Sequence, residues 1–230
     1  MERILQCERD LIVPYPEIEI SENTHIYNGH ALIEAKVATM RDENTPCSVF
    51  RSLVQEVTML MCFDAMSHLK LEEWYVRTPI CETVGKRIAG KKLVLVPIWR
   101  AGDAMLPAMQ AIVPQARTGS VGVYRDEETL RPHKYFWKMP KDIENREAFV
   151  LDPMLATGGS ADFVVRELKR IGCPAVHFMC IIAAPQGVNL MQKNHPDVEL
   201  YIAHLDRGLN AHGYIVPGLG DAGDRIYGTK

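Results

Sequence analysis

Between residues 93 and 216, short runs of apolar residues alternate with stretches of helical periodicity. Continuous apolar runs are typical of strands buried on both faces, and strands separated by helices are typical of parallel sheets. The pattern therefore predicts an α/β fold in which a mostly parallel sheet is flanked by helices. The expected strands span residues 93–99, 120–124, 148–151, 176–183, 200–203 and 214–216, and the expected helices span residues 45–68, 104–112, 161–171 and 188–194.

The rest of the chain divides at two places. Residues 1–28 are irregular, with prolines and no clear period, and we expect an N-terminal extension followed by a single domain over residues 29–230. The first helix is expected to have Thr45 as its N-cap and Pro46 at its first position. Residues 125–141 are polar and charged without helical spacing, which predicts a long, flexible hairpin or flap.

Charge and hydropathy exclude several classes of protein. There are 29 acidic and 26 basic residues, giving a formal net charge of −3 and no basic run, so we expect no nucleic-acid partner. The longest apolar run, over residues 176–185, is about half the ~20 residues of a transmembrane helix, so we expect no membrane span. No secretory signal is visible, and none of the six cysteines forms a closely spaced redox or zinc pair. A reduced, cytoplasmic protein is expected.

The most informative motif follows the strand that ends at Leu151. It reads Asp-Pro-Met-Leu-Ala-Thr-Gly-Gly-Ser over residues 152–160 and leads into a helix. Ligands of open parallel sheets bind at the carboxyl ends of strands, and a helix N-terminus with glycines lets backbone N–H groups approach a phosphate. The motif predicts a phosphate loop, with Asp152 placed to meet ribose hydroxyls or a magnesium ion. The alternative is a plain helix cap in which the glycines serve only the turn.

A second strand, over residues 93–99, ends in Arg100-Ala101-Gly102. Arginine binds phosphate well, although an arginine at a strand end can also be an ordinary surface residue. Two candidate phosphate loops at two strand ends predict a ligand with phosphates at both of its ends.

Two further loops carry candidate binding residues. Residues 218–223 match the G-x-G-x-x-G fingerprint, but the second strand and distant acid that a dinucleotide site needs are missing, so we reject that interpretation. The glycine-rich loop can instead present main-chain groups to a small planar ring, or be a simple turn. Within the flap, Arg125 directly follows a strand and is the candidate ligand, while His212 is interpreted as structural.

Four motifs together resemble one family. Residues 152–160 resemble the ribose-phosphate loop of uracil phosphoribosyltransferases, residues 97–102 their pyrophosphate loop, residues 124–130 their flexible arm and residues 212–225 their uracil-binding C-terminus. The motifs occur in family order, and the likeness runs from about residue 30 to residue 230.

The resemblance implies a type I phosphoribosyltransferase fold. It also implies a pyrimidine-salvage reaction in which uracil and 5-phosphoribosyl 1-pyrophosphate give UMP and pyrophosphate. By motif match, the catalytic residues would be Arg125, Asp152 and Asp221, and the uracil contacts would be Ile215, Gly220, Asp221 and Ala222. The residues implied to bind the donor are Arg100, Arg125, Asp152, Pro153, Met154, Leu155, Ala156, Thr157, Gly158, Gly159, Ser160 and Asp221.

The resemblance further implies Mg²⁺ as cofactor, with no direct protein ligand assigned and with Asp152 or Asp221 as candidates for a contact through water. It also suggests a homo-oligomer, dimeric or tetrameric, and GTP as a candidate activator. The sequence departs from the wider family at two places. Trp99 replaces the usual aliphatic residue, and Pro153 follows Asp152 where many type I enzymes have a second acid. The latter suggests that magnesium is held more by substrate than by protein.

Two alternatives stay open at this point. One is a regulatory protein on the same fold that binds RNA, which would need a basic face for the nucleic-acid backbone. The other is a phosphoribosyltransferase for a different base, or a member of the family that has lost activity.

Overall fold

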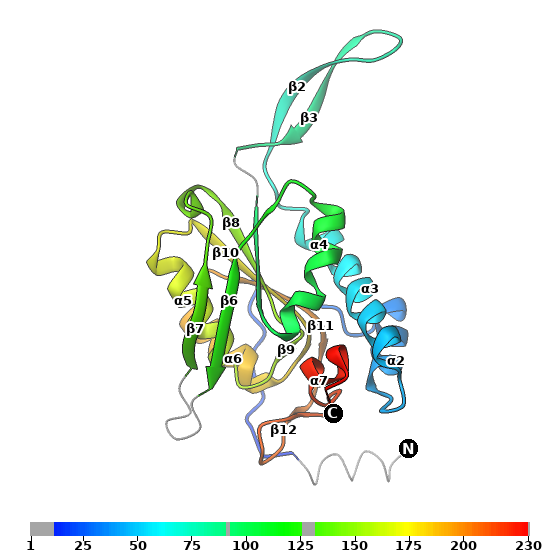
Figure 1. Ribbon diagram of the computed structural model, residues 1–230, viewed down its shortest axis with the longest axis vertical. Helices are drawn as coiled ribbons and strands as arrows, with labels where there is room; N and C mark the ends of the chain where they lie inside the picture. Colours follow the sequence, from blue (N-terminus) through cyan, green and yellow to red (C-terminus); the bar gives the residue numbers. More distant parts are fainter. Residues whose placement is uncertain (1–11, 91–92, 126–131, 230) are drawn as a thin grey trace.

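The computed structural model describes residues 12–90, 93–125 and 132–229. Its body is one large sheet with helices on both faces (Figure 1), so the predicted α/β fold is confirmed. The sheet contains β1 (Thr24–Ile26), β4 (Val94–Trp99), β5 (Arg117–Thr118), β6 (Ser120–Arg125), β7 (Pro132–Lys138), β8 (Glu147–Leu151), β9 (Met154–Leu155), β10 (Ala175–Ala183) and β11 (Glu199–Leu205). The helices are α2 (Ala31–Arg41), α3 (Cys47–Ala65), α4 (Leu106–Ile112), α5 (Gly159–Arg170), α6 (Pro185–Asn194) and α7 (Ala222–Tyr227), with short 3₁₀ helices η1 (Ala101–Ala104) and η2 (Ile143–Asn145).

The strand order is β1-β11-β10-β8-β4-β6-β7, with β5 beside β4 and β9 beside β10. Every pair is parallel except β6 and β7, which form an antiparallel hairpin at one edge. Because parallel strands run the same way, their carboxyl ends meet at one edge of the sheet. That edge also carries a two-stranded pair formed by β12 (Gly208–Leu209) and β13 (Ile215–Val216).

Alternate residues of the central strands belong to two different cores. Leu95 and Leu151 pack with Phe50 in the core under α2, α3 and α4. Val94 and Val150 pack on the opposite face, in the core under α5 and α6. Side chains of a strand alternate between the two faces of a sheet, so strands covered on both sides must be apolar throughout, as the sequence pattern predicted.

Two local expectations were wrong, and one helix was missed. Helix α3 has Pro46 as its N-cap and makes no side-chain cap bond, whereas the Thr45 hydroxyl donates instead to the Thr39 carbonyl at 2.6 Å. Helix α2 was not foreseen. Residues 24–26, expected to be irregular, form β1 and extend the sheet beside β11.

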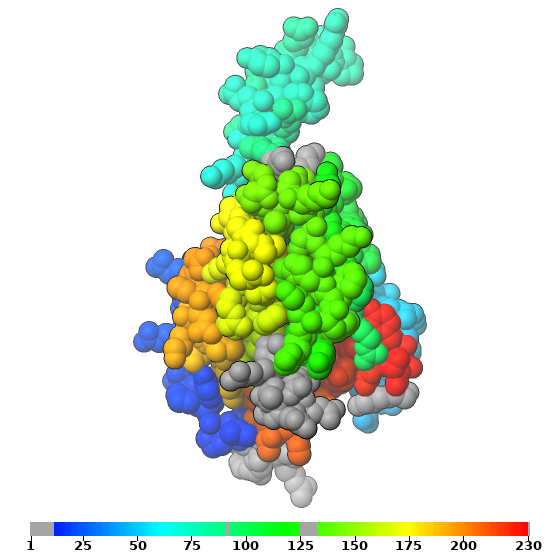
Figure 2. Space-filling model, turned by 60° about the vertical axis from the view of Figure 1, so that its left-hand side comes forward, coloured from blue at the N-terminus to red at the C-terminus, as the bar shows by residue number. Residues whose placement is uncertain are grey.

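An antiparallel hairpin, β2 (Leu71–Arg77) and β3 (Glu82–Ile88), projects from the body (Figures 1 and 2) and was also not predicted. This hairpin with its connecting turn is called the β2–β3 arm below. Its residues are mostly exposed on both faces, so no polar–apolar alternation marks it in the sequence.

Within the described ranges, no helix is long and apolar enough to cross a membrane. The cysteines that the structure describes are all free thiols, as expected: Cys47, Cys62, Cys81, Cys173 and Cys180.

Candidate active site

The first predicted phosphate loop lies where it was expected, between the end of β8 and the start of α5. Gly158 is the N-cap of α5 and has a φ of 84°, in the left-handed region. A pocket of about 410 Å³ opens above this helix end. It is lined by Asp152, Met154, Leu155, Ala156, Thr157, Gly158, Gly159, Ser160, Ala161, Gly213 and Asp221.

The glycine at position 158 has a second role that the sequence did not indicate. A Cβ there would lie 3.1 Å from both the Gly187 carbonyl oxygen and the Leu190 Cδ2 of α6. Close packing of α5 against α6, together with the positive φ, therefore requires glycine whether or not a phosphate binds.

Asp152 is the only acid of this loop, and its pKa is shifted from the ordinary value. Its Oδ1 accepts a hydrogen bond from the Met154 N–H at 3.2 Å, and no cation of the described residues contacts it. Burial, with a smaller contribution from the nearby Asp221 carboxylate, raises the pKa of Asp152 to about 7. A partly buried carboxylate that lines a pocket and has no cation partner is a candidate ligand for a cation.

The second predicted loop lies beside the first. A Cβ on Gly102 would come within 2.2 Å of the Leu151 carbonyl, so this glycine allows the loop after β4 to pack on the end of β8. A smaller pocket of about 210 Å³ joins the two loops. The residues that line both this pocket and the larger one are Asp152, Met154, Ser160 and Asp221.

Arg100 lines the smaller pocket, but its guanidinium lies against α7. Nη2 is 3.3 Å from Asp224 Oδ1, and the Tyr227 hydroxyl donates to the Arg100 carbonyl at 3.0 Å. The Arg100 side chain is 57% exposed, so little holds it there and it can turn toward a ligand.

The C-terminal loop connects β13 to α7. Gly218 and Gly220 both have positive φ, and a Cβ on Gly218 would lie 2.1 Å from the Ile215 carbonyl oxygen. Asp221 caps α7 by accepting the Asp224 N–H at 2.9 Å, and it also lines the two pockets above. By contrast, Ile215 and Ala222 are buried, with side chains inside the core under α3. Only their main-chain groups are available to a ligand.

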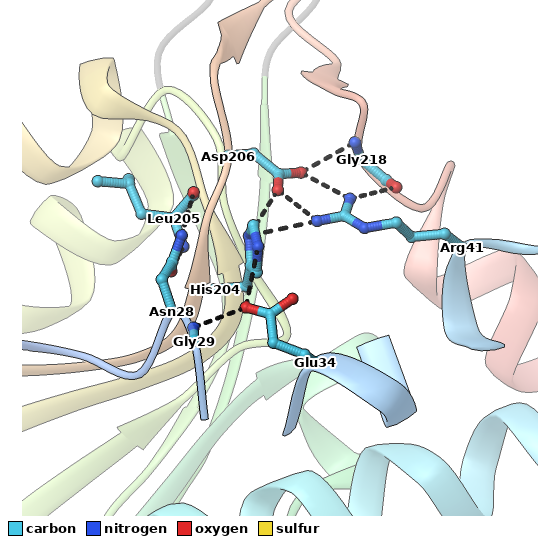
Figure 3. Close-up of polar contacts among 8 residues, drawn as sticks. All are labelled: Asn28, Gly29, Glu34, Arg41, His204, Leu205, Asp206 and Gly218. Atoms are coloured by element: carbon cyan, nitrogen blue, oxygen red, sulfur yellow. Dashed lines mark hydrogen bonds and ion pairs between the residues drawn. The ribbon is translucent and has the colours of Figure 1, made fainter. Parts of the chain in front are cut away.

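A buried carboxylate that the sequence analysis missed holds this loop (Figure 3). Asp206 Oδ2 accepts the Gly218 N–H at 2.9 Å and an Arg41 N–H at 2.9 Å. Its Oδ1 accepts from Arg41 Nη2 and lies 2.9 Å from His204 Nδ1. Burial alone would raise the pKa of Asp206, but the hydrogen bonds from Arg41 and His204 outweigh it, so the pKa is lowered. Arg41 also donates to the Gly218 carbonyl at 2.8 Å.

The predicted flap is partly described. Strands β6 and β7 form a hairpin, and Trp99 stacks on Phe136 of β7 with ring centroids 4.7 Å apart. Lys134 forms an ion pair with Glu167 of α5 at 3.0 Å. The side chain of Arg125 and the whole of residues 126–131 lie outside the described residues, so the predicted role of Arg125 stays a prediction.

Together, the fold and these loops define an α/β protein with a ligand site at the carboxyl edge of a parallel sheet, where two strand-end loops meet a third from the C-terminus. A family model described as Uracil phosphoribosyltransferase matches residues 27–229, and the chain belongs to this family.

Curated relatives agree with that assignment, and one solved structure shares the fold. The chain is 52% identical to the uracil phosphoribosyltransferase of Macrococcus caseolyticus over 206 residues, which cover 90% of this chain and 98% of the relative. It is 52% identical to that of Streptococcus pneumoniae over 202 residues, covering 88% and 97%. The AQ2163 protein from Aquifex aeolicus has a similar structure, with a TM-score of 0.81 and 36% identity, covering 91% of this chain and 97% of that one.

Proposed function

We propose that the chain transfers the phosphoribosyl group of 5-phosphoribosyl 1-pyrophosphate to uracil, giving UMP and pyrophosphate in pyrimidine salvage. Membership of the family supports this activity. The observation that carries it is the pair of adjoining pockets, which share Asp152 and Asp221. A donor with a phosphate at each end of its ribose can span the two.

The proposed roles follow from position. Main-chain N–H groups of residues 157–160 would bind the 5′-phosphate at the start of α5, and Asp152 would accept the ribose hydroxyls. Arg100 and Arg125 would bind the pyrophosphate. Main-chain groups around Ile215, Gly220 and Ala222 would bind uracil, because two of these side chains are buried in the core.

Magnesium fits the residues present. Asp152 and Asp221 line the same pockets, and carboxylate oxygens are ligands that Mg²⁺ accepts, directly or through water. Asp152, with its raised pKa, would be stabilised as the anion by a cation. When bound, the metal would supply positive charge to the leaving pyrophosphate.

The chain's own contribution is charge and shape. Loss of pyrophosphate from the anomeric carbon leaves cationic character on the ribose and negative charge on the leaving group. The ionised Asp152 favours the first, and the guanidinium of Arg100 favours the second. No residue is assigned as a base for uracil, since loop N–H groups that stabilise negative charge on its carbonyls make the ring N–H more acidic, and its proton can pass to water as the bond to the ribose forms.

Incubation of the protein with the donor and labelled uracil tests the proposal, with cytosine as the matched substrate. Cytosine reverses two hydrogen-bond polarities, and two buried mismatches cost roughly 2–6 kcal/mol. We expect UMP to form and cytosine to react on the order of 30-fold less efficiently, or slower still, in kcat/KM. Ile215→Val should keep this preference because the recognising groups are main chain. If no UMP forms, the chain is an inactive or a regulatory member of the family. Comparable rates with cytosine would refute recognition of uracil by main-chain groups.

We also propose that the chain forms a homo-oligomer, dimeric or tetrameric. The β2–β3 arm carries large exposed apolar side chains, among them Tyr75 at 80% and Ile80 at 92% exposure. An isolated two-stranded hairpin is marginally stable in water, so a second chain is the natural cover for it. Sedimentation should give a mass above the 25.9 kDa monomer, and Tyr75→Asp with Ile80→Asp should lower it. Ile112→Asp, a change of the same kind at an exposed residue off the arm, is the control. Adding GTP to the assay tests the predicted activation.

A further inference from the structure

Two histidines and a glutamate meet at the edge of the sheet opposite the active site. His68 follows the end of α3, Glu147 is the first residue of β8, and His177 lies near the start of β10. Their ligand atoms all lie within 4.8 Å of one another, and this is the only such group in the part of the chain that the structure describes. The proposed phosphate loop leaves the other end of β8, so the cluster plays no part in that site.

His177 is an unusual buried residue. It is 5% exposed, and neither of its ring nitrogens has a hydrogen-bond partner. Its ring stacks on Phe149 with centroids 4.4 Å apart, and the His68 ring lies tilted against it at 4.6 Å. Glu147 Oε2 is likewise buried without a hydrogen bond. Buried polar groups without a hydrogen bond cost about 1–3 kcal/mol each, and an ion bound between His177 and Glu147, whose ion-pair contact is 3.4 Å, would satisfy both.

The distances from Glu147 to the two histidines match those of a metal site, and the whole group lies within 4.8 Å. Glu147 Oε2 lies 3.4 Å from His68 Nε2 and 3.4 Å from His177 Nε2. Nitrogen and oxygen ligands about 2.0–2.2 Å from a tetrahedral zinc ion lie roughly 3.3–3.6 Å apart, which is the separation seen here. A direct hydrogen bond would be shorter, near 2.9 Å.

We propose that His68, Glu147 and His177 bind a divalent transition-metal ion of the Zn²⁺ class. Two imidazoles and one carboxylate suit such an ion, whereas Mg²⁺ and Ca²⁺ prefer oxygen alone. Glu147 also lines a pocket of about 340 Å³ beneath the β2–β3 arm, which gives an ion and a water ligand access. The bound ion links the segment after α3 to β8 and β10, at the base of the arm.

The test is a titration of the metal-free full-length chain with Zn²⁺, followed by calorimetry and by thermal unfolding. We expect one ion per chain and a rise in Tm. His68→Gln should weaken binding at least tenfold with the fold intact, because the side chain is 36% exposed. Glu147→Gln should do the same. His25→Gln is the matched control, since His25 contacts Glu199 at 2.6 Å as a pair without a third ligand.

A second readout distinguishes a specific metal site from nonspecific binding at the surface. Co²⁺ in the wild type should give the intense visible absorption of a four-coordinate ion, and His68→Gln should abolish it while His25→Gln leaves it unchanged. Equal affinities in wild type and His68→Gln, or no uptake of Zn²⁺ by the wild type, would overturn the proposal. UMP formation is measured separately and does not depend on this result.

Discussion

Two carboxylates at the carboxyl edge of the sheet, the buried Asp206 and the partly buried Asp152, have opposite surroundings. Asp206 is enclosed by Arg41, His204 and the Gly218 N–H, and its pKa is lowered because these hydrogen bonds outweigh burial. Asp152 has one main-chain hydrogen bond and a second acid nearby, and its pKa is raised to about 7 by burial. The first acid is satisfied within the protein, whereas the second lacks a positive partner.

This difference separates structure from function. Removing a buried acid whose charge is balanced within the protein costs stability, because its partners are left unpaired. An acid without a cation costs stability until a ligand or metal supplies one. The contrast therefore assigns Asp206 to holding the C-terminal loop and Asp152 to binding, and each assignment can be tested by removing one carboxylate.

The largest effect is expected from Asp206→Ala. The change leaves the guanidinium of Arg41 without its carboxylate and the Gly218 N–H without an acceptor. Breaking a buried ion pair costs ~3–5 kcal/mol, and the lower end, about 3 kcal/mol, applies because 20% of the Arg41 side chain is exposed. Urea unfolding measures this loss.

Asp152→Asn is the control for that experiment, and its free energy of unfolding should be no lower than that of the wild type. A loss of stability as large as that of Asp206→Ala would mean that both acids are structural, and the comparison would fail.

The sequence predicted one of these acids and not the other, for a physical reason. Asp152 stands between a buried strand and a Thr-Gly-Gly-Ser helix start, a local pattern that carries its chemistry. Asp206 depends on Arg41, which is 165 residues away in the chain, and no local pattern indicates a contact of that kind. The sheet could be predicted because its strands are apolar on both faces. The β2–β3 arm could not, because it has no buried face.

The second prediction concerns turnover. Asp152→Asn should lower kcat at least tenfold, about 1.4 kcal/mol, because a charge beside the ribose and metal is lost. Steady-state kinetics with uracil and the donor measure it. Near-normal turnover in a folded variant would remove Asp152 from the site and leave its raised pKa without a functional meaning.

The third prediction is a pH dependence of stability. With a folded pKa of about 7 against an ordinary 3.8, Asp152 keeps its proton in the folded chain after the unfolded chain has lost it. The free energy of unfolding should therefore fall as pH rises from about 4 to about 7, by at most ~1.4 kcal/mol per unit from this group. Asp206 acts in the opposite sense, because its pKa is lowered in the folded chain. The stability that it contributes is present above the ordinary pKa of an aspartate and is lost as pH falls below that value.

Urea unfolding across this pH range, in the wild type and in Asp152→Asn, isolates the Asp152 contribution. The variant should show a shallower fall with pH. Identical slopes in the two proteins would mean that Asp152 is ionised normally, and the contrast with Asp206 would then lie in its contacts alone.

The smallest effect is expected at Trp99, which contacts both the pocket that Asp152 lines and strand β7 of the flap. Trp99 lines the same small pocket as Asp152 and stacks on Phe136 of β7. An aromatic pair contributes ~0.5–1.5 kcal/mol beyond its buried area, so Trp99→Leu should raise the donor KM roughly two- to twelvefold if the stack positions the flap. Phe136→Leu should have a similar effect, and the double variant should be little worse than either single one, because both remove the same contact. Fully additive effects on KM would show that the stack is only packing, and that the ligand-binding region ends at the pocket shared by Asp152 and Asp221.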